Sequence, residues 1–237
     1  MVRAMLPLAP FSSTPSPIAA TIDWGRTRYA DAWRRQNELV AQRVAGDVGD
    51  TLVLTEHEPV FTLGLRAGAD AHLVWNAEQL EREGVEVVKT NRGGDITYHG
   101  PGQIVGYPIF DLDHHFTDVH RFLRTLEEAV IGTLEAYKIK SGRIEGLTGV
   151  WLDGDDPAKA RKICAFGIRA SRWVTMHGFA FNVNTDISYF DQIIPCGIAD
   201  KGVTCMAKEL GGLLDMDEVK ARLKLELTDL FDVELVA

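Results

Sequence analysis

Cysteine is scarce in this chain of 237 residues. Only Cys164, Cys196 and Cys205 occur, an odd number with no Cys-x-x-Cys pair among them. Small secreted domains that are held by disulfides carry cysteines in even numbers and regular spacings. A chain of this length also buries enough apolar surface to fold without a disulfide or metal staple. We therefore expect a reducing compartment, the cytoplasm, and consider each thiol on its own chemistry.

The chain also lacks an excess of basic residues and any long apolar run. It has 25 Lys and Arg against 34 Asp and Glu, a formal net charge of −9. Nucleic-acid binding needs a basic surface, so no nucleic-acid partner is expected. No window approaches the roughly 18 uninterrupted apolar residues of a membrane-spanning helix, so no membrane association is expected either.

Repeats, low-complexity blocks and linker-like stretches are absent after the N-terminus. Residues 1–18 carry one basic residue and a short apolar stretch that prolines interrupt, which is too short for a secretory signal. We expect them to form a flexible N-terminal extension; a transit peptide is the alternative, weakened by the low Arg count. Residues 19–237 are expected to form a single domain.

Hydrophobic periodicity predicts more strands than helices. Helices are expected at residues 27–45, 77–83 and 117–137 and from Asp215 onward, and strands at 51–55, 60–64, 85–88, 104–112, 147–152, 162–170 and 173–183. The clearest helix is 117–137, in which apolar residues recur three and four apart. Because the strands adjoin without regular helical crossovers, the pattern favours an α+β fold with a mixed or antiparallel sheet and flanking helices.

The densest glycine cluster is RGGDITYHGPGQ, residues 92–103. It is neither a Gly-Lys-Ser/Thr phosphate loop nor a GxGxxG dinucleotide turn. Its glycines allow positive φ and a close approach of the backbone to a ligand. The side chains between them offer hydrogen-bond donors, an aromatic ring and a titratable imidazole. A hairpin turn that needs glycine for backbone reasons alone is the competing interpretation.

Cys196 is the thiol best placed for chemistry. It lies between Pro195 and Gly197, a rigid and a permissive residue, in a loop able to present its side chain. The thiolate is the reactive form and a nearby cation lowers the pKa of a thiol, so Cys196 is a candidate nucleophile; an ordinary loop cysteine is the alternative. Cys164 alternates with apolar residues and is expected to be a small buried hydrophobe.

No metal site is expected. His57, His99, His177 and Cys196 show neither the i, i+4 helical pairing nor the Cys-x-x-Cys spacing of zinc motifs.

Five segments, in order, resemble the lipoyl(octanoyl) transferase family. They are EHEPVFTLG at 56–64, RGGDITYHGPGQ at 92–103, KICAFG at 162–167, HGFAFNV at 177–183 and PCG at 195–197. The resemblance extends from about residue 23 to residue 209. Five ordered motifs are far more specific than any one of them.

The resemblance implies a fold, an activity and a set of site residues. The fold would be that of the biotin/lipoate protein ligases. The activity would be transfer of an octanoyl or lipoyl group from octanoyl-acyl carrier protein to a specific lysine of lipoyl domains, in 2-oxoacid dehydrogenase complexes and the glycine-cleavage H protein, with no cofactor. Cys196 would carry the acyl group as a thioester, and Lys162 would lower the pKa of its thiol. The residues implied for the acyl pocket are Arg92, Gly93, Gly94, Asp95, Ile96, Thr97, Tyr98, His99, Ala165, Phe166, Gly167, Gly178, Phe179 and Ala180.

Such a mechanism is consistent with elementary thiol chemistry. The donor is already a thioester, so acyl transfer to Cys196 is a near-balanced exchange and needs no ATP. A thiol with a pKa of about 8.5 is roughly 3% thiolate at pH 7, and lowering its pKa to about 7 makes about half of it thiolate. Because acyl carrier proteins are acidic, the donor would need a local basic face, for which Arg161, Arg169 and Arg172 are candidates unless they are merely solvated.

Three other activities stay open at this stage. An ATP-dependent lipoate or biotin ligase of the same fold would need no cysteine. A non-catalytic acyl-protein binding module would keep the pocket without turnover. A Cys–His thioesterase would use His99 or His177 and release the acyl group to water.

Overall fold

The strands are rich in β-branched and aromatic residues, and the helices carry apolar residues three and four apart. The structure, a computed structural model, describes residues 17–194 and 201–236. In chain order the elements, with η for a short 3₁₀ helix, are β1 (Ile18–Thr27), α1 (Tyr29–Ala45), β2 (Asp50–His57), β3 (Val60–Leu63), η1 (Ala69–His72), α2 (Ala77–Glu83), β4 (Glu86–Lys89), β5 (Thr97–His99), β6 (Gln103–Ile109), η2 (Leu112–His114), α3 (Val119–Ala136), β7 (Val150–Leu152), β8 (Arg161–Ser171), β9 (Val174–Asn182), η3 (Ile187–Gln192), β10 (Gly202–Val203), α4 (Met206–Leu210), α5 (Met216–Phe231) and β11 (Glu234–Val236).

Eight of the described strands form one mixed sheet. Its order is β10-β8-β9-β6-β2-β1-β11, with β7 paired to β8. The run from β2 through β6 and β9 to β8 is antiparallel, whereas β1 is parallel to both of its neighbours. A two-residue turn joins β8 to β9, and both of its residues, Arg172 and Trp173, have positive φ, as a tight hairpin turn that matches strand twist requires.

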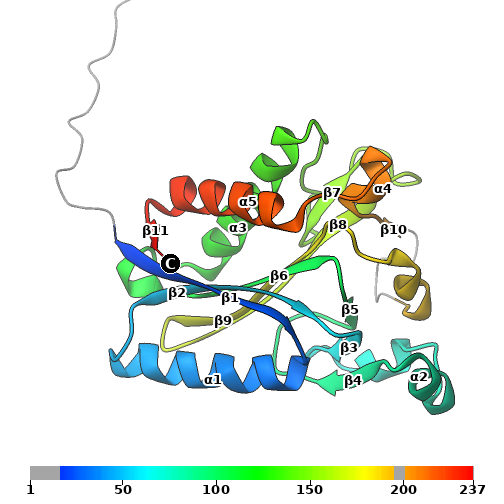
Figure 1. Cartoon of the computed structure of the whole chain (residues 1–237), viewed down its shortest axis with the longest axis horizontal. Coiled ribbons are helices and arrows are strands. Elements are labelled where there is room, and N and C mark those ends of the chain that lie inside the picture. Colours follow the sequence, from blue (N-terminus) through cyan, green and yellow to red (C-terminus); the bar gives the residue numbers. More distant parts are fainter. Residues whose placement is uncertain (1–16, 195–200, 237) are drawn as a thin grey trace, which may run out of the picture.

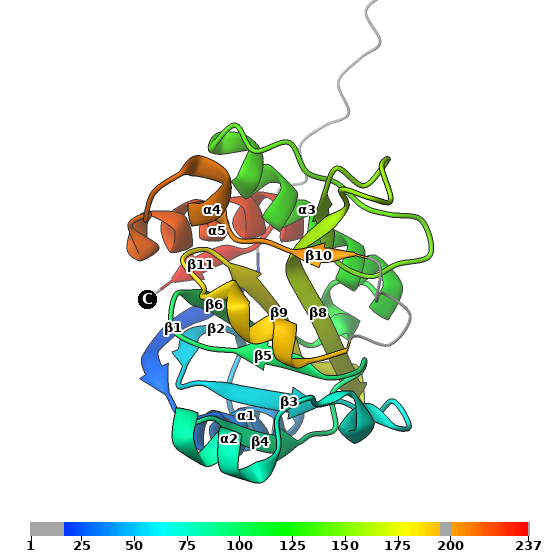
Figure 2. The ribbon, with the colours of Figure 1, turned by 90° about the vertical axis from the view of Figure 1, so that its right-hand side faces the viewer.

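A second, three-stranded sheet lies to one side of the large one together with α2 (Figures 1 and 2). Its order is β4-β3-β5, with β3 parallel to β4 and antiparallel to β5. Because β3 follows β2 and β5 precedes β6, the chain passes twice between the two sheets, the second time within the glycine-rich segment 92–103. This arrangement brings the 92–103 segment next to β8 and β9.

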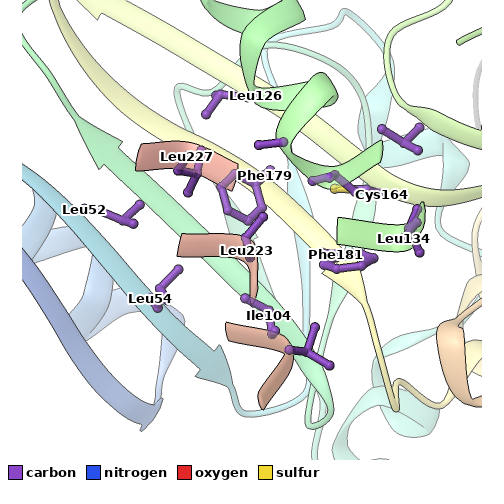
Figure 3. Packing of buried hydrophobic residues seen from close by; sticks show 14 of the residues in the cluster. Leu52, Leu54, Ile104, Leu126, Leu134, Cys164, Phe179, Phe181, Leu223 and Leu227 are labelled. Atoms are coloured by element: carbon purple, nitrogen blue, oxygen red, sulfur yellow. The ribbon is translucent and has the colours of Figure 1, made fainter. Parts of the chain in front are cut away.

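Helices cover both faces of the large sheet (Figure 1). Helix α1 packs on one face against β6 and β9, and α3 and α5 pack together on the other, where α3 reaches β7 and β8. The main core lies between the sheet and these two helices. Figure 3 shows the buried side chains Leu52, Ile104, Phe179 and Phe181 of the strands against Leu126, Leu134, Leu223 and Leu227 of the helices.

The predicted helices agree closely with the structure. The apolar stripe of α3 is confirmed, since Phe122, Leu126, Val130 and Leu134 are fully buried. Helix α2 has its predicted bounds and ends at Gly84 in the left-handed conformation. The Asp215 side chain caps α5 by accepting hydrogen bonds from the backbone N–H groups of the first turn.

The α+β class with a mixed sheet and flanking helices is confirmed, but several elements were not predicted. These are the ten-residue strand β1, the short strands β5, β10 and β11, helix α4 and the 3₁₀ helices η1, η2 and η3. Thr27, predicted in the first helix, ends β1, and α1 begins at Tyr29. Strands β10 and β11 have two and three residues, and pairing with a neighbouring strand decides such short elements more than propensity does.

The predicted flexible extension at residues 1–18 lies almost wholly outside the described residues, and β1 begins at Ile18. Among the residues that the structure describes, no helix is long and apolar enough to cross a membrane.

Candidate active site

A cavity of about 370 Å³ opens where the two sheets meet. Strands β5, β6, β8, β9 and β10 wall it, and Figure 2 faces the side of the molecule on which β5, β8, β9 and β10 lie. Residues of the loop before β5, of the segment 146–148, of α1 and of η3 also line it. A cavity of this size with a mixed lining lies in the range of small-molecule sites in proteins.

The structure brings most of the predicted pocket residues together around this cavity. The predicted residues that line it are Arg92, Gly94, Asp95, Ile96, Thr97, His99, Ala165, Phe166, Gly167, Gly178, Phe179 and Ala180, and Lys162 lines it with them. Gly93 and Tyr98 do not. Successive residues of a strand point to opposite faces, so Tyr98 faces away and stacks on Tyr189 at 4.5 Å between ring centroids.

Arg92 links the glycine-rich loop to β3 by hydrogen bonds. Its side chain is buried and donates hydrogen bonds to Thr62 Oγ1 and to the carbonyl oxygens of Thr62 and Gly93, at 2.6–3.1 Å. Burial lowers the pKa of the guanidinium. Arg92 thus fixes β3 to the loop and adds a buried positive charge to the cavity wall.

Two buried histidines lie next to each other at the cavity: His99 lines it, and the ring of His57 lies 5.7 Å from that of His99. His57 Nε2 is 2.6 Å from the Tyr107 hydroxyl, and His99 Nδ1 is 2.8 Å from Gln103 Oε1. Burial lowers the pKa of His57 to about 4 and holds that of His99 well below its usual range. Both rings are therefore neutral hydrogen-bonding groups near pH 7.

His177 lines the cavity with a strained backbone, at φ of 61°. Its Nε2 is 2.6 Å from Asn91 Oδ1. Burial, with a smaller contribution from the charges of Arg92 and Arg169, lowers the pKa of His177 to about 3. In the described part of the chain, no group of three or more His, Cys, Asp or Glu has the arrangement of a metal site.

Lys162 contributes an amine to the cavity wall. Its Nζ lies 4.6 Å from the centroid of the Trp151 indole, and burial lowers the pKa of the ammonium from 10.5 to about 8. The nearby Cys164 and Glu127 act in the opposite direction, because negative charge favours the ammonium. A lysine with a pKa near 8 can exchange its proton at physiological pH.

The three cysteines have different positions. Cys196, the candidate nucleophile, lies outside the described residues, but Ile193 and Lys201 on either side of this segment both line the cavity. Cys164 is fully buried in the main core, as predicted, and burial raises the pKa of its thiol. Cys205 is buried at the start of α4.

Comparison with known proteins identifies the family. A profile of the lipoyl protein ligase A/B catalytic domain matches residues 28–228. The octanoyltransferase of Flavobacterium johnsoniae is 52% identical over 226 residues, which cover 90% of this chain and 97% of that one. The octanoyltransferase of Cytophaga hutchinsonii is 48% identical, with 90% and 92% coverage. The chain belongs to the lipoyl(octanoyl) transferase family. It is an acyltransferase, as the sequence resemblance implied.

Solved structures confirm the fold expected of this family. A bipartite lipoate protein ligase from Thermoplasma acidophilum superposes with a TM-score of 0.69 at 14% identity, covering 94% of this chain and 86% of that one. Lipoate-protein ligase A bound with ATP gives 0.67 at 15% identity, with 93% and 87% coverage. The biotin protein ligase of Aquifex aeolicus gives 0.54 at 14% identity, with 90% and 70% coverage. At these identities the likeness establishes the fold alone.

Sequence reasoning missed several cavity residues, among them Tyr29 and Trp151. Tyr29 is the first residue of α1 and has no neighbouring motif, so nothing in the sequence indicated its role. Trp151 could have been found, because the predicted strands 147–152 and 162–170 flank a turn. Pairing them as a hairpin places Trp151 beside Lys162, as in the structure.

Proposed function

We propose that this chain transfers an octanoyl group from octanoyl-acyl carrier protein to a specific lysine of lipoyl domains, through a thioester on Cys196. Its acceptors would be the lipoyl domains of 2-oxoacid dehydrogenase complexes and the glycine-cleavage H protein. Residues 19–237 would act as one catalytic domain, in the reducing cytoplasm that a free catalytic thiol requires. The 48–52% identity to octanoyltransferases over most of the chain supports this assignment.

The observation that carries the proposal is the position of Lys162. It lies in the wall of a cavity with an apolar side, and burial brings the pKa of its ammonium to about 8. The residues flanking the segment of Cys196 reach the same cavity. A cation at such a site is suited to stabilise a thiolate and to exchange protons with it.

In the first step the Cys196 thiolate attacks the carbonyl carbon of the donor thioester. A new C–S bond forms, the C–S bond to the carrier breaks, and the departing carrier thiolate takes a proton from the Lys162 ammonium. With a pKa of about 8, about nine tenths of Lys162 carries this proton at pH 7. Lys162 ends the step as the neutral amine.

In the second step the acceptor lysine attacks the Cys196 thioester. An amide C–N bond forms, the C–S bond to Cys196 breaks, and the neutral Lys162 amine takes the proton that the attacking nitrogen loses. The ammonium and the thiolate are thereby restored together. A lysine with an ordinary pKa would be a poor proton acceptor here, because almost none of it is neutral at pH 7.

The apolar side of the cavity is suited to a fatty chain. Ile96, Val105, Phe166, Phe179 and Ala180 contribute to the lining. Burying a methylene contributes about 0.8 kcal/mol, so six or seven of them would contribute roughly 5 kcal/mol to binding. This would discriminate an octanoyl chain from much shorter ones.

Of the three arginines considered for the acidic carrier protein, Arg161 is already paired. It bonds both oxygens of Glu209, at 2.6 and 2.7 Å, and forms an ion pair with Asp153. Arg169 and Arg172 are exposed near the β8–β9 turn. They are the better candidates for contact with the donor.

The histidines argue against hydrolysis of the acyl group to water. A Cys–His thioesterase needs a histidine whose pKa lies near 7. The pKa of His177 is about 3 and that of His99 is well below its usual range, so neither is an effective base.

Intact-protein mass spectrometry tests the proposal. Incubation with octanoyl-acyl carrier protein should add one octanoyl group to the wild type and none to Cys196→Ala. Adding an apo lipoyl domain should move that group to the domain without ATP. Octanoate with ATP in place of the acylated carrier is the control for a ligase, and lipoyl-domain acylation in that arm alone would reject the proposal.

A further inference from the structure

Trp151 is held rigidly beside Lys162. Its side chain is 1% exposed, and its residue in β7 pairs directly with Lys162 in β8. On the other edge of β7, two backbone hydrogen bonds of 2.8 and 2.9 Å join Trp151 to Gly142. The indole therefore has little freedom to move.

The indole face of Trp151 lies against the Lys162 ammonium. Nζ lies 4.6 Å from the ring centroid, within the distance at which an aromatic face attracts a cation. Among the described residues, Lys162 Nζ makes no hydrogen bond or ion pair. Its position thus depends on the ring and on the groups that confine its stem.

Gly149 confines the stem of Lys162 from the other side. A Cβ at Gly149 would lie 3.1 Å from Lys162 Cε and 3.1 Å from Trp151 Nε1, and φ at Gly149 is 132°. The Gly149 N–H donates a 2.9 Å hydrogen bond to Glu127 Oε1. Because glycine has no side chain, Gly149 leaves a passage for the stem of Lys162 beside the Trp151 indole.

Glu127 fixes the position of Gly149 by this hydrogen bond. Its carboxylate is fully buried in α3, and its second oxygen accepts hydrogen bonds from Arg124 and Arg143, at 2.6 and 2.9 Å. Hydrogen bonds thus join α3 to the loop before β7, beside the stem of Lys162 in β8.

We propose that Trp151 is the positioning residue for Lys162: its indole face holds the ammonium at the cavity wall, in the passage that Gly149 leaves open. The proposal extends the function proposed above, since it presumes that Lys162 exchanges the protons of acyl transfer. The role is positional, because the ring itself neither gives nor takes a proton.

Two matched variants test this role. Trp151→Phe and Trp151→Leu both shorten the side chain, but only phenylalanine retains an aromatic face. The pKa of Lys162 can be measured without any acyl donor, from the pH dependence of its labelling by an amine reagent, read by peptide mass spectrometry. We expect the pKa in Trp151→Leu to lie about one unit below that in Trp151→Phe. The pH profile of acyl transfer should move with it, and Trp151→Phe should retain most of the wild-type rate.

A measurement on the wild type avoids dependence on the folding of the variants. The NMR signal of the Trp151 indole N–H should shift as pH crosses the pKa of Lys162, and this shift should vanish in Lys162→Met. An indole signal that does not respond to pH, or equal Lys162 pKa values in the two Trp151 variants, would overturn the positioning role. If instead the wild type forms no Cys196 adduct while the indole still reports Lys162, the proposed function fails and the contact stands.

Discussion

The proton exchange proposed for Lys162 needs a buried ammonium, and burying that charge lowers the free energy of unfolding. The ammonium has a pKa of about 8 in the folded protein against an ordinary value of 10.5, so folding disfavours its charged form. We expect Lys162→Met to raise the free energy of unfolding at pH 7 by about 1–2 kcal/mol, because a neutral side chain removes this penalty. Urea denaturation would measure it.

The pH dependence of that gain distinguishes charge burial from better packing. Between pH 8 and 10.5 the unfolded chain binds the proton of Lys162 more readily than the folded protein does, so wild-type stability rises with pH. The advantage of Lys162→Met should therefore be complete below pH 8 and disappear toward pH 10.5. Lys159→Met, at an exposed site, should stay within about 0.5 kcal/mol throughout; a gain that persists at high pH contradicts the argument.

The sequence resemblance located most of the candidate site, but not the orientation of its side chains. Tyr98 and His99 are adjacent in one motif, yet strand alternation places only His99 at the cavity. Trp151 belongs to none of the quoted motifs and enters the site through strand pairing with Lys162. Motifs identify residues that belong together, whereas pairing decides which of them face each other.

At the scale of elements, β6 and β9 approach each other closely at Gly106. Gly106 pairs with Phe179, and a Cβ at Gly106 would lie 2.0 Å from Phe179 Cζ. We expect Gly106→Ala to lower the free energy of unfolding by about 1–3 kcal/mol, since Phe179 must move from a well-packed site. Because Phe179 also lines the cavity, binding of the octanoyl chain should weaken as well.

Gly212→Ala is the matched control for this prediction, because a Cβ there would meet nothing within 4 Å. Its stability should stay within about 0.5 kcal/mol of the wild type. Combining Gly106→Ala with Phe179→Leu should recover part of the loss, because the smaller side chain leaves room for the new methyl group. Equal stabilities of Gly106→Ala and Gly212→Ala would show that Phe179 adapts without cost.

Elements with strong local signals were predicted, and elements held by their neighbours were not. Helix α3 has a continuous apolar stripe and a capping aspartate, so its sequence alone defines it. Strand β11 has three residues and forms because β1 offers an unpaired edge. Strand β5 has three residues inside the glycine cluster, where no alternation could be recognised.

At the scale of the whole molecule, the strand order could not be predicted. Periodicity indicated an α+β class, but the parallel pairing of β1 with β11 joins residues from the two ends of the described chain. The second sheet likewise depends on contacts between strands that are separated by α2. Such pairings depend on packing of the complete fold, which no local pattern contains.

The buried histidines make the whole molecule sensitive to mild acid. His57, His99 and His177 are neutral in the folded protein, with the pKa of His57 about 4 and that of His177 about 3. In the unfolded chain each binds a proton near pH 6.5, so their contribution to stability is present above pH 6.5 and is lost as pH falls toward those lower values. Each histidine can contribute a slope of up to about 1.4 kcal/mol per pH unit.

The informative window is pH 6.5 to about 5, because ordinary carboxylates titrate below it. Unfolding free energies measured across this window should fall steadily with pH in the wild type. His57→Gln should reduce that slope, whatever its effect on stability at pH 7, because one proton-binding difference is removed. His120→Gln, at an exposed site, should leave the slope unchanged. If His57→Gln keeps the wild-type slope, His57 is not held neutral by burial. A low pKa would then no longer exclude these histidines as catalytic bases.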